Sequence, residues 1–383
     1  MRHVPLTLAL CAAVGVTSPA AAQDVGTLPA RLQVQLDSLV DNTRVPGATL
    51  GVALPDGTHF GVAAGFADTV LAQPMGRDAR MLQGSVGKTY FAAVAMQYVA
   101  EGRLDLDAHL SDFLGDEPWF HRLPNAEDIT LRQLMRHTSG IVRYELNPQF
   151  LEDLTADPLR TYTPEERLAY LFDTEAPFPA GEGWDYADTN YILLAMVMER
   201  VSGLDAYGEV RARLLEPLGL ENTVPSDRPD VPGLAQGYAG AGNPFGGRDA
   251  MLEDGRLVIN PQFEWAGGGF ASTAEDLARW TWAVHRGQAF PEPLLDEVRD
   301  GVPAPLGPQG RYGLGVIMME LPAGTAWGHS GFMPGYRTET YYFPDHGFAL
   351  ALQLNTTSPG AFQEPLLLIV SDLAALVGEE LGR

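Results

Sequence analysis

The sequence contains a serine and a lysine whose spacing suits nucleophilic chemistry. Ser85 and Lys88 lie three residues apart, and apolar residues follow them at helical intervals, which predicts a helix of about 17 residues that starts at Ser85. Residues three apart share one face of a helix, so the Ser85 Oγ and the Lys88 amine should reach each other. A serine hydroxyl attacks a carbonyl only after a base takes its proton, and a neutral amine is such a base.

Lys88 is the only lysine in the chain, since the 25 Lys and Arg residues comprise 24 Arg and this one residue. Arginine keeps its proton in proteins and could not act as the base. The positive end of the helix dipole and burial both disfavour an ammonium, and we expect them to keep Lys88 neutral. The alternative interpretation is a solvated lysine near a helix start. Ser-x-x-Lys is common by chance, but in a chain with one lysine it is a much stronger indication.

Two further segments carry polar groups beside apolar elements. Tyr186 and Asp188 stand at the start of an apolar stretch that predicts another helix, and His329 and Ser330 lie between glycines next to a predicted strand. With Ser85-x-x-Lys88 they place a hydroxyl, an amine, a phenol and an imidazole in three separate segments.

In these residues the sequence resembles the penicillin-recognising serine hydrolases. That family carries Ser-x-x-Lys, Tyr-x-Asn and Lys/His-Thr/Ser-Gly in this order, and the nearest branch is that of the class C β-lactamases, the D-Ala-D-Ala carboxypeptidases and the related esterases. The segments 134–140, 267–273 and 312–315 are similar to the family as well. The resemblance therefore covers almost the whole mature chain.

The resemblance implies a catalytic role for each matching residue. Ser85 would be the nucleophile that forms an acyl-enzyme, Lys88 its base, and Tyr186 the proton shuttle to the leaving group and the deacylating water. His329 would supply positive field and a hydrogen bond near Tyr186. The backbone N–H groups of Ser85 and Phe332 would form the oxyanion hole.

Substrate binding is assigned to four residues. By resemblance, Ser330 would donate a hydrogen bond to a substrate carboxylate, and Gly331 and Asp188 belong to the same motifs. Arg337 follows soon after His329 and is a second candidate for that carboxylate, with a salt bridge along its strand as an equal alternative.

Asp188 departs from the family pattern, because it stands where relatives carry Asn. An ionised carboxylate only accepts hydrogen bonds, and beside Lys88 it would raise the pKa of the lysine. Either Asp188 is protonated, or Tyr186 carries more of the base role, or the third residue of the motif points elsewhere. The change counts against recognition of an acylated amide and efficient β-lactam hydrolysis, and it could instead suit a substrate with a free amine.

Other motifs favour plainer interpretations. His137 is expected to be part of a structural turn after a short helix. The remaining histidines show no metal-ligand spacing, and the segment 328–332 fails as Gly-x-Ser-x-Gly at its last position, so neither a zinc site nor an α/β-hydrolase elbow is predicted. We expect no metal and no cofactor.

The composition limits the classes of binding partner, and the amino-terminal segment indicates the cellular location. The net charge of −24 counts against nucleic acid or anionic lipid as a partner. An apolar run follows Arg2 and His3 and ends at the small residues 20–22, which predicts a signal peptide over residues 1–22, cleaved after Ala22. We therefore expect a periplasmic or secreted protein with no integral membrane segment after cleavage; the sequence leaves the oligomeric state open.

The pattern of elements predicts an α+β fold. Helical spacing begins at about residue 28, strands are expected over 48–54, 59–65, 312–319, 335–343 and 347–354, and a last helix over about 364–381. Thr163 and Ser272 begin capping-box sequences of two helices. We expect one antiparallel sheet built from both ends of the chain (about 28–80 and 305–383), flanked by helices, with a large all-helical insertion over about 85–290.

The predicted protein, residues 23–383, is a serine hydrolase that cleaves a small amide or ester, or a short peptide, through an acyl-enzyme. A D-Ala-D-Ala carboxypeptidase-like peptidase is the first choice, a carboxylesterase the second and a β-lactamase the third. A hypothesis of another class is a non-catalytic protein that binds peptidoglycan fragments or acts as a sensor. The intact Ser85, Lys88, Tyr186 and His329 count against it.

Overall fold

The computed structural model describes residues 27–240, 243, 245, 248–358 and 360–382, so the predicted signal peptide lies outside the described residues. None of the described helices is long and apolar enough to cross a membrane. The helices are α1 (Leu28–Asn42), α2 (Lys88–Ala100), α3 (Ser111–Leu114), α4 (Leu131–Arg136), α5 (Pro148–Ala156), α6 (Pro164–Ala169), α7 (Thr189–Ser202), α8 (Ala206–Val210), α9 (Ala274–His285), α10 (Leu295–Arg299) and α11 (Leu366–Leu381). Short turns of helix at the site are η1 (Gly84–Gly87), η3 (Tyr144–Leu146), η5 (Pro261–Phe263) and η6 (Trp265–Gly267).

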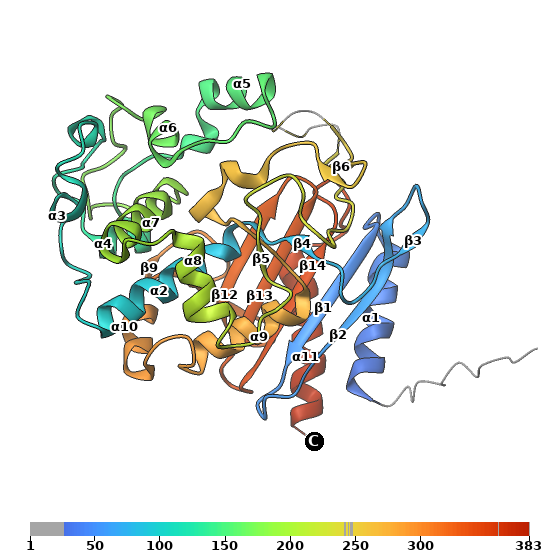
Figure 1. Cartoon of the computed structure of the whole chain (residues 1–383). Coiled ribbons are helices and arrows are strands. Elements are labelled where there is room, and N and C mark those ends of the chain that lie inside the picture. The colour runs from blue at the N-terminus through green and yellow to red at the C-terminus, as the bar shows by residue number, and fades with distance from the viewer. Residues whose placement is uncertain (1–26, 241–242, 244, 246–247, 359, 383) are drawn as a thin grey trace, which may run out of the picture.

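The main sheet is formed by both ends of the chain, as expected. Its nine antiparallel strands run in the order β3-β2-β1-β14-β13-β12-β11-β10-β9, and β1 lies beside β14 (Figure 1). The strands are β1 (Gly47–Ala53), β2 (His59–Asp68), β3 (Gln73–Pro74), β9 (Val302–Pro303), β10 (Arg311–Tyr312), β11 (Ile317–Leu321), β12 (Gly324–Met333), β13 (Tyr336–Phe343) and β14 (Phe348–Leu354).

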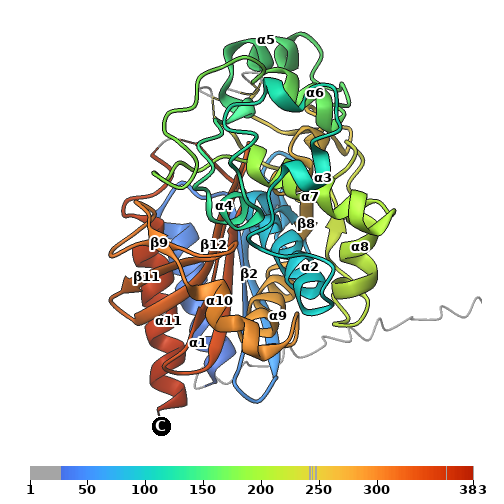
Figure 2. The ribbon, with the colours of Figure 1, turned by 90° about the vertical axis from the view of Figure 1, so that its left-hand side faces the viewer.

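Helices cover both faces of this sheet. On one face lie α1 and α11, which contact each other, and Leu32 and Leu36 of α1 are fully buried against the sheet. On the opposite face α9 packs on β1, β13 and β14 (Figure 2). The contact with α9 is close because a Cβ on Gly51 would lie 2.0 Å from the carbonyl oxygen of Ala274.

The remaining helices form a second layer beside the α9 face, with α2 and α7 in contact at its centre (Figures 1 and 2). The predicted insertion over 85–290 needs two corrections. It contains strands, since β8 (Phe270–Ser272) and β5 (Val224–Pro225) form a small sheet with β4 (Met81–Leu82), which precedes the insertion, and β6 (Leu252–Glu253) pairs with β7 (Arg256–Leu257). Its last helix, α9, belongs to the main sheet, because its apolar side packs there.

The predicted helix starts and strand bounds are confirmed in part. The Thr163 capping box begins α6, with its side chain accepting from the Glu166 N–H. The second helix start is shifted by one residue, because Thr273 rather than Ser272 caps α9. The predicted strand over 312–319 is split into β10 and β11, and β12, which carries His329, was not predicted as a strand because its glycines weaken the strand pattern.

Candidate active site

The nucleophile candidate lies on the first turn of a helix. Ser85 is half-buried in η1, a 3₁₀ turn that continues directly into α2, and Lys88 is fully buried. The Lys88 Nζ lies 3.0 Å from the Ser85 Oγ. The three-residue spacing therefore brings the amine and the hydroxyl together, as the sequence predicts.

The end of β12 lies directly against this turn. A Cβ on Gly331 would lie 1.8 Å from the Gln83 carbonyl oxygen, and a Cβ on Gly84 would lie 2.6 Å from the Phe332 amide nitrogen. Gly84 also has φ +54°, a conformation that glycine adopts without strain. The two backbones meet closely only because both positions lack a side chain, and this contact brings the amides of Ser85 and Phe332 to one place.

The register of the β12–β13 hairpin orients the Phe332 amide. Met333 and Tyr336 are opposite each other across a two-residue turn, and Phe332 is opposite Arg337. Opposite residues in an antiparallel pair alternate between bonded and non-bonded, and the pair that closes a two-residue turn is bonded. The Phe332 N–H therefore points away from β13. This orientation suits the predicted oxyanion hole of Ser85 and Phe332.

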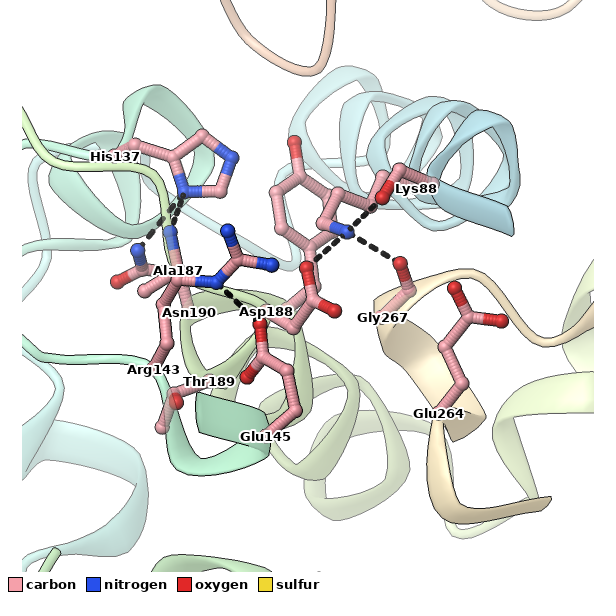
Figure 3. Close-up of polar contacts among 12 residues, drawn as sticks. Lys88, His137, Arg143, Glu145, Ala187, Asp188, Thr189, Asn190, Glu264 and Gly267 are labelled. Carbon is pink, nitrogen blue, oxygen red and sulfur yellow. Dashed lines mark hydrogen bonds and ion pairs between the residues drawn. The ribbon is translucent and has the colours of Figure 1, made fainter. Parts of the chain in front are cut away.

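Lys88 makes three contacts at the bottom of the site. Besides the Ser85 Oγ, its Nζ lies 2.5 Å from Asp188 Oδ1 and donates to the Gly267 carbonyl oxygen (Figure 3). Burial lowers the pKa of the Lys88 amine, but the charge of Asp188, with contributions from Tyr186 and Glu264, outweighs it and raises the pKa above its ordinary value. The expectation of a neutral Lys88 is therefore wrong for this state, because a carboxylate lies against the amine.

Tyr186 is held over Lys88 by an aromatic neighbour. The Lys88 Nζ lies 4.9 Å from the centre of the Tyr186 ring. The centre of the His137 ring lies 4.2 Å from that of the Tyr186 ring. His137 ends α4 in a left-handed conformation, and its Nδ1 accepts from Ala187 N at 3.3 Å and from Asn190 Nδ2 at 3.0 Å (Figure 3). Burial raises the pKa of the Tyr186 phenol despite the charge of Lys88. His137 therefore has the structural role predicted for it.

His329 differs from its expected role. Its Nδ1 lies 2.6 Å from the Ser330 carbonyl oxygen and must donate to it, which leaves Nε2 to accept from the Tyr312 hydroxyl at 3.0 Å. Burial, with the charge of Lys88, lowers the pKa of His329 to about 3. The imidazole is therefore neutral and adds no positive field. Its hydrogen bond goes to Tyr312, whose ring lies 6.0 Å from that of Tyr186.

The predicted substrate-binding residues differ in their exposure to solvent. Ser330 and Arg337 are partly exposed, whereas Asp188 is only 6% exposed and is engaged by Lys88. Asp188 is thus placed beneath the nucleophile, not on a substrate surface, and Gly331 has a packing role against Gln83. Arg337 makes no ion pair with any described carboxylate, but its charge acts on Glu339, two residues along β13, and opposes the rise in the pKa of that carboxyl. Its guanidinium lies 5.7 Å from the centre of the Phe332 ring.

Two buried carboxyl groups flank Asp188 and were not predicted. Glu145 on η3 pairs with Arg143 at 2.5 Å (Figure 3). Glu264 accepts from the Gly269 N–H at 3.2 Å. Burial, with the charge of Asp188, raises the pKa of Glu264 to about 8 and that of Glu145 to about 7. The glycine-rich segment near 267 was noted as family-like, but no sequence signal marked these carboxyls. Within the described ranges, no group of three or more His, Cys, Asp or Glu could hold a metal ion.

Comparison with known proteins agrees with this geometry. The family model described as Beta-lactamase matches residues 33–373. The chain is 29% identical over 302 residues to Esterase EstB of Burkholderia gladioli, covering 72% of this chain and 75% of the esterase. It is 23% identical over 335 residues to D-aminopeptidase of Brucella anthropi, covering 85% of this chain but only 59% of that relative.

Among solved structures, a D-stereospecific amidohydrolase from Streptomyces sp. superposes with a TM-score of 0.76 at 30% identity, covering 89% of this chain and 97% of the other. The antiparallel sheet with flanking helices is therefore that of a known group of hydrolases. Because the family model spans nearly all the described chain and Ser85 and Lys88 meet as the mechanism requires, the protein belongs to the beta-lactamase family and is a serine hydrolase.

Proposed function

We propose that the protein removes the C-terminal residue from short peptides with D-configured residues, through an acyl-enzyme on Ser85. The observation that carries the proposal is the partly exposed Arg337, which makes no ion pair within the described part of the chain and is opposite Phe332 on the neighbouring strand. A guanidinium beside the oxyanion hole suits the free carboxylate of a C-terminal residue. The names of the D-aminopeptidase and D-stereospecific amidohydrolase relatives support a D-configured amide.

In the proposed reaction, the Ser85 Oγ attacks the substrate carbonyl carbon while its proton passes to a neutral Lys88 amine. The N–H groups of Ser85 and Phe332 hold the negative oxygen of the tetrahedral intermediate. Tyr186 gives its phenol proton to the leaving nitrogen and takes a proton from Lys88. A water molecule then releases the acyl group by the same steps in reverse.

The first test asks whether Ser85 is the nucleophile. Wild type and Ser85→Ala are incubated with a fluorophosphonate and, separately, with a fluorescent penicillin, and intact masses are measured. We expect an adduct on wild type that is absent from Ser85→Ala. If neither probe gives an adduct on wild type, the serine hydrolase chemistry proposed here is wrong and the non-catalytic alternative gains support.

The second test addresses the role of Arg337. For a D-Ala-D-Ala peptide, Arg337→Ala should lower kcat/KM by about 10-fold or more through KM, because a charge-assisted hydrogen bond is lost. The corresponding peptide amide, which lacks the carboxylate, should be affected much less. Arg256→Ala, at an exposed ion pair with Asp230, is the control and should leave both substrates unchanged. Equal losses for peptide and amide would contradict the assignment.

A carboxylesterase is the second candidate, because Phe332 is 40% exposed beside the oxyanion hole and the likeness to EstB is substantial. It predicts that a short p-nitrophenyl ester has the highest kcat/KM of the panel and that Arg337→Ala leaves this value unchanged. Nitrocefin should be the poorest substrate, since Asp188 stands where the family pattern has Asn and is engaged by Lys88.

We also propose that the protein is exported and cleaved after Ala22. Expression of the full chain with its own leader, followed by intact mass of the exported product, should give a chain that begins at Gln23. A product that retains residues 1–22 would contradict this location.

A further inference from the structure

The contacts of Lys88 bear on its protonation state. Its Nζ faces three oxygen atoms, namely the Ser85 Oγ at 3.0 Å, Asp188 Oδ1 at 2.5 Å and the Gly267 carbonyl oxygen. An ammonium has three N–H donors and no lone pair, whereas a neutral amine keeps one lone pair for accepting a proton. The Asp188 carboxylate and the Gly267 carbonyl oxygen can only accept, whereas the Ser85 hydroxyl can accept or donate. As an ammonium, Lys88 donates to all three and has nothing with which to accept the Ser85 proton.

The pair of Lys88 and Asp188 is removed from water. Lys88 is fully buried and Asp188 is 6% exposed, so solvent and salt screen their attraction little. Burial alone would favour a neutral lysine, but a carboxylate at 2.5 Å opposes it. The family pattern that the chain resembles has an amide at this position, which accepts the same hydrogen bond without a charge.

Other titratable and charged groups face the pair from every element packed on it. The two histidines among them are neutral, because burial lowers the pKa of each. The charges that remain are those of Arg143, of Glu145 above about pH 7 and of Glu264 above about pH 8. The full set is Tyr186 and Tyr191 around the start of α7, His137 at the end of α4, Arg143, Tyr144 and Glu145 at η3, Glu264 before η6, Tyr312 on β10 and His329 on β12.

We propose that Asp188 is a positioning residue that holds Lys88 as an ammonium in the resting enzyme and thereby sets the pH range in which Ser85 is acylated. The proposal rests on the function proposed above, in which Ser85 is the nucleophile. Only after Lys88 loses its extra proton to solvent does its amine accept the proton of the Ser85 hydroxyl. Acylation therefore becomes faster as the pH rises. Because of Asp188, this increase in rate occurs in the alkaline range.

The experiment measures the rate of fluorophosphonate labelling of Ser85 by intact mass, from about pH 6 to about pH 10, for wild type and Asp188→Asn. The amide still accepts from Lys88 but carries no charge. We expect the acid limb of the rate profile to move to lower pH by about 1 to 3 units, so that Asp188→Asn reacts at least about 10-fold faster than wild type near neutral pH. A merely structural role for Asp188 would lower the rate without moving the limb.

Glu209→Gln is the matched control. Glu209 is also buried and also pairs with a cation, Arg213 at 2.6 Å, but it lies on α8 and contacts none of the site residues. Its profile should coincide with that of wild type. An equal shift in this variant would mean that any lost buried carboxylate moves the limb, and the proposal for Asp188 would be overturned.

Glu264→Gln provides the test if Asp188→Asn does not fold. Because the pKa of Glu264 is about 8, its charge acts on Lys88 only above that pH, and the rate gain should be confined to that range. The proposal is overturned if a folded Asp188→Asn keeps the acid limb of the wild-type rate profile or loses labelling at every pH. It is also overturned if Glu264→Gln shows no increase in labelling rate above about pH 8. If wild type itself is not labelled at any pH, the serine chemistry of the proposed function has failed instead.

Discussion

At the scale of single residues, the chemistry depends on one amine and what surrounds it. Lys88 is the only lysine in the chain, and it lies within reach of the hydroxyl that it has to activate. The same amine is bound by Asp188, the residue at which the sequence departs from the family pattern. The sequence predicted that Ser85 and Lys88 meet, and the structure adds that the carboxylate of Asp188 dominates the charge state of the lysine.

Lys88→Arg tests whether proton removal or positive charge is the function of this residue. The guanidinium retains the charge but cannot release its proton, so acylation of Ser85 should fall by at least about 10³-fold. The rate of fluorophosphonate labelling measures this loss, and circular dichroism checks the fold. Raising the pH should not rescue the variant, although it accelerates wild type. Acylation close to the wild-type rate would contradict the role of Lys88 as a base.

At the scale of elements, the site exists because η1 and β12 touch through their backbones. The close approach at Gly84 and Gly331 leaves no room for a Cβ at either position. The hairpin register then turns the Phe332 N–H away from β13. The oxyanion hole is therefore a product of two elements that are about 240 residues apart in the chain.

Gly331→Ala tests this contact. The new Cβ would lie 1.8 Å from the Gln83 carbonyl oxygen, so η1 and β12 must separate and the two amides no longer converge. Loss of one oxyanion donor costs about 10²-fold or more in acylation, and labelling kinetics should show at least that loss. Gly61→Ala is the control, since its Cβ would meet nothing nearer than 3.4 Å. Normal acylation in a folded Gly331→Ala would show that the contact is not required.

At the scale of the whole molecule, the fold buries several ionisable groups in their neutral forms. Burial lowers the pKa of His285 and of His329 to about 3. Burial also raises the pKa of Glu264 to about 8 and those of Glu145 and Glu339 to about 7. These groups link folding stability to pH in opposite directions.

The expected pH dependence follows from the two directions. Below about pH 6.5 the unfolded state binds more protons through its histidines, so stability falls as the pH drops toward 3. Above about pH 4.5 the folded state binds more protons through the buried glutamates, so stability falls as the pH rises toward 8. Scanning calorimetry should give the highest Tm at about pH 5 to 6, with a lower Tm at pH 4 and at pH 8.

Glu264→Gln isolates one contribution to the alkaline decrease. With this carboxyl removed, the difference in Tm between pH 6 and pH 8 should become smaller than in wild type, because one group no longer binds a proton on folding. Wild-type Tm values at pH 8 that equal or exceed those at pH 6 would contradict this account.

The sequence alone determined the features that depend on local spacing and residue type. A three-residue interval on a helix puts Ser85 and Lys88 together, alternation and turn residues predict β1, β2, β13 and β14, and a single lysine among arginines marks the base. The β12 strand was missed, because its glycines weaken the local pattern while serving a contact with a distant segment.

Only the tertiary structure decided which charges meet. Asp188, Glu145 and Glu264 come from separate segments of the chain. Packing alone brings Asp188 and Glu264 to Lys88 and Glu145 to Asp188, and it removes all three carboxyls from water. The same packing makes His329 neutral and turns Asp188 from a substrate-binding candidate into the partner of the lysine. A pKa depends on burial and on neighbours in space, and neither is encoded in the distance between residues along the chain.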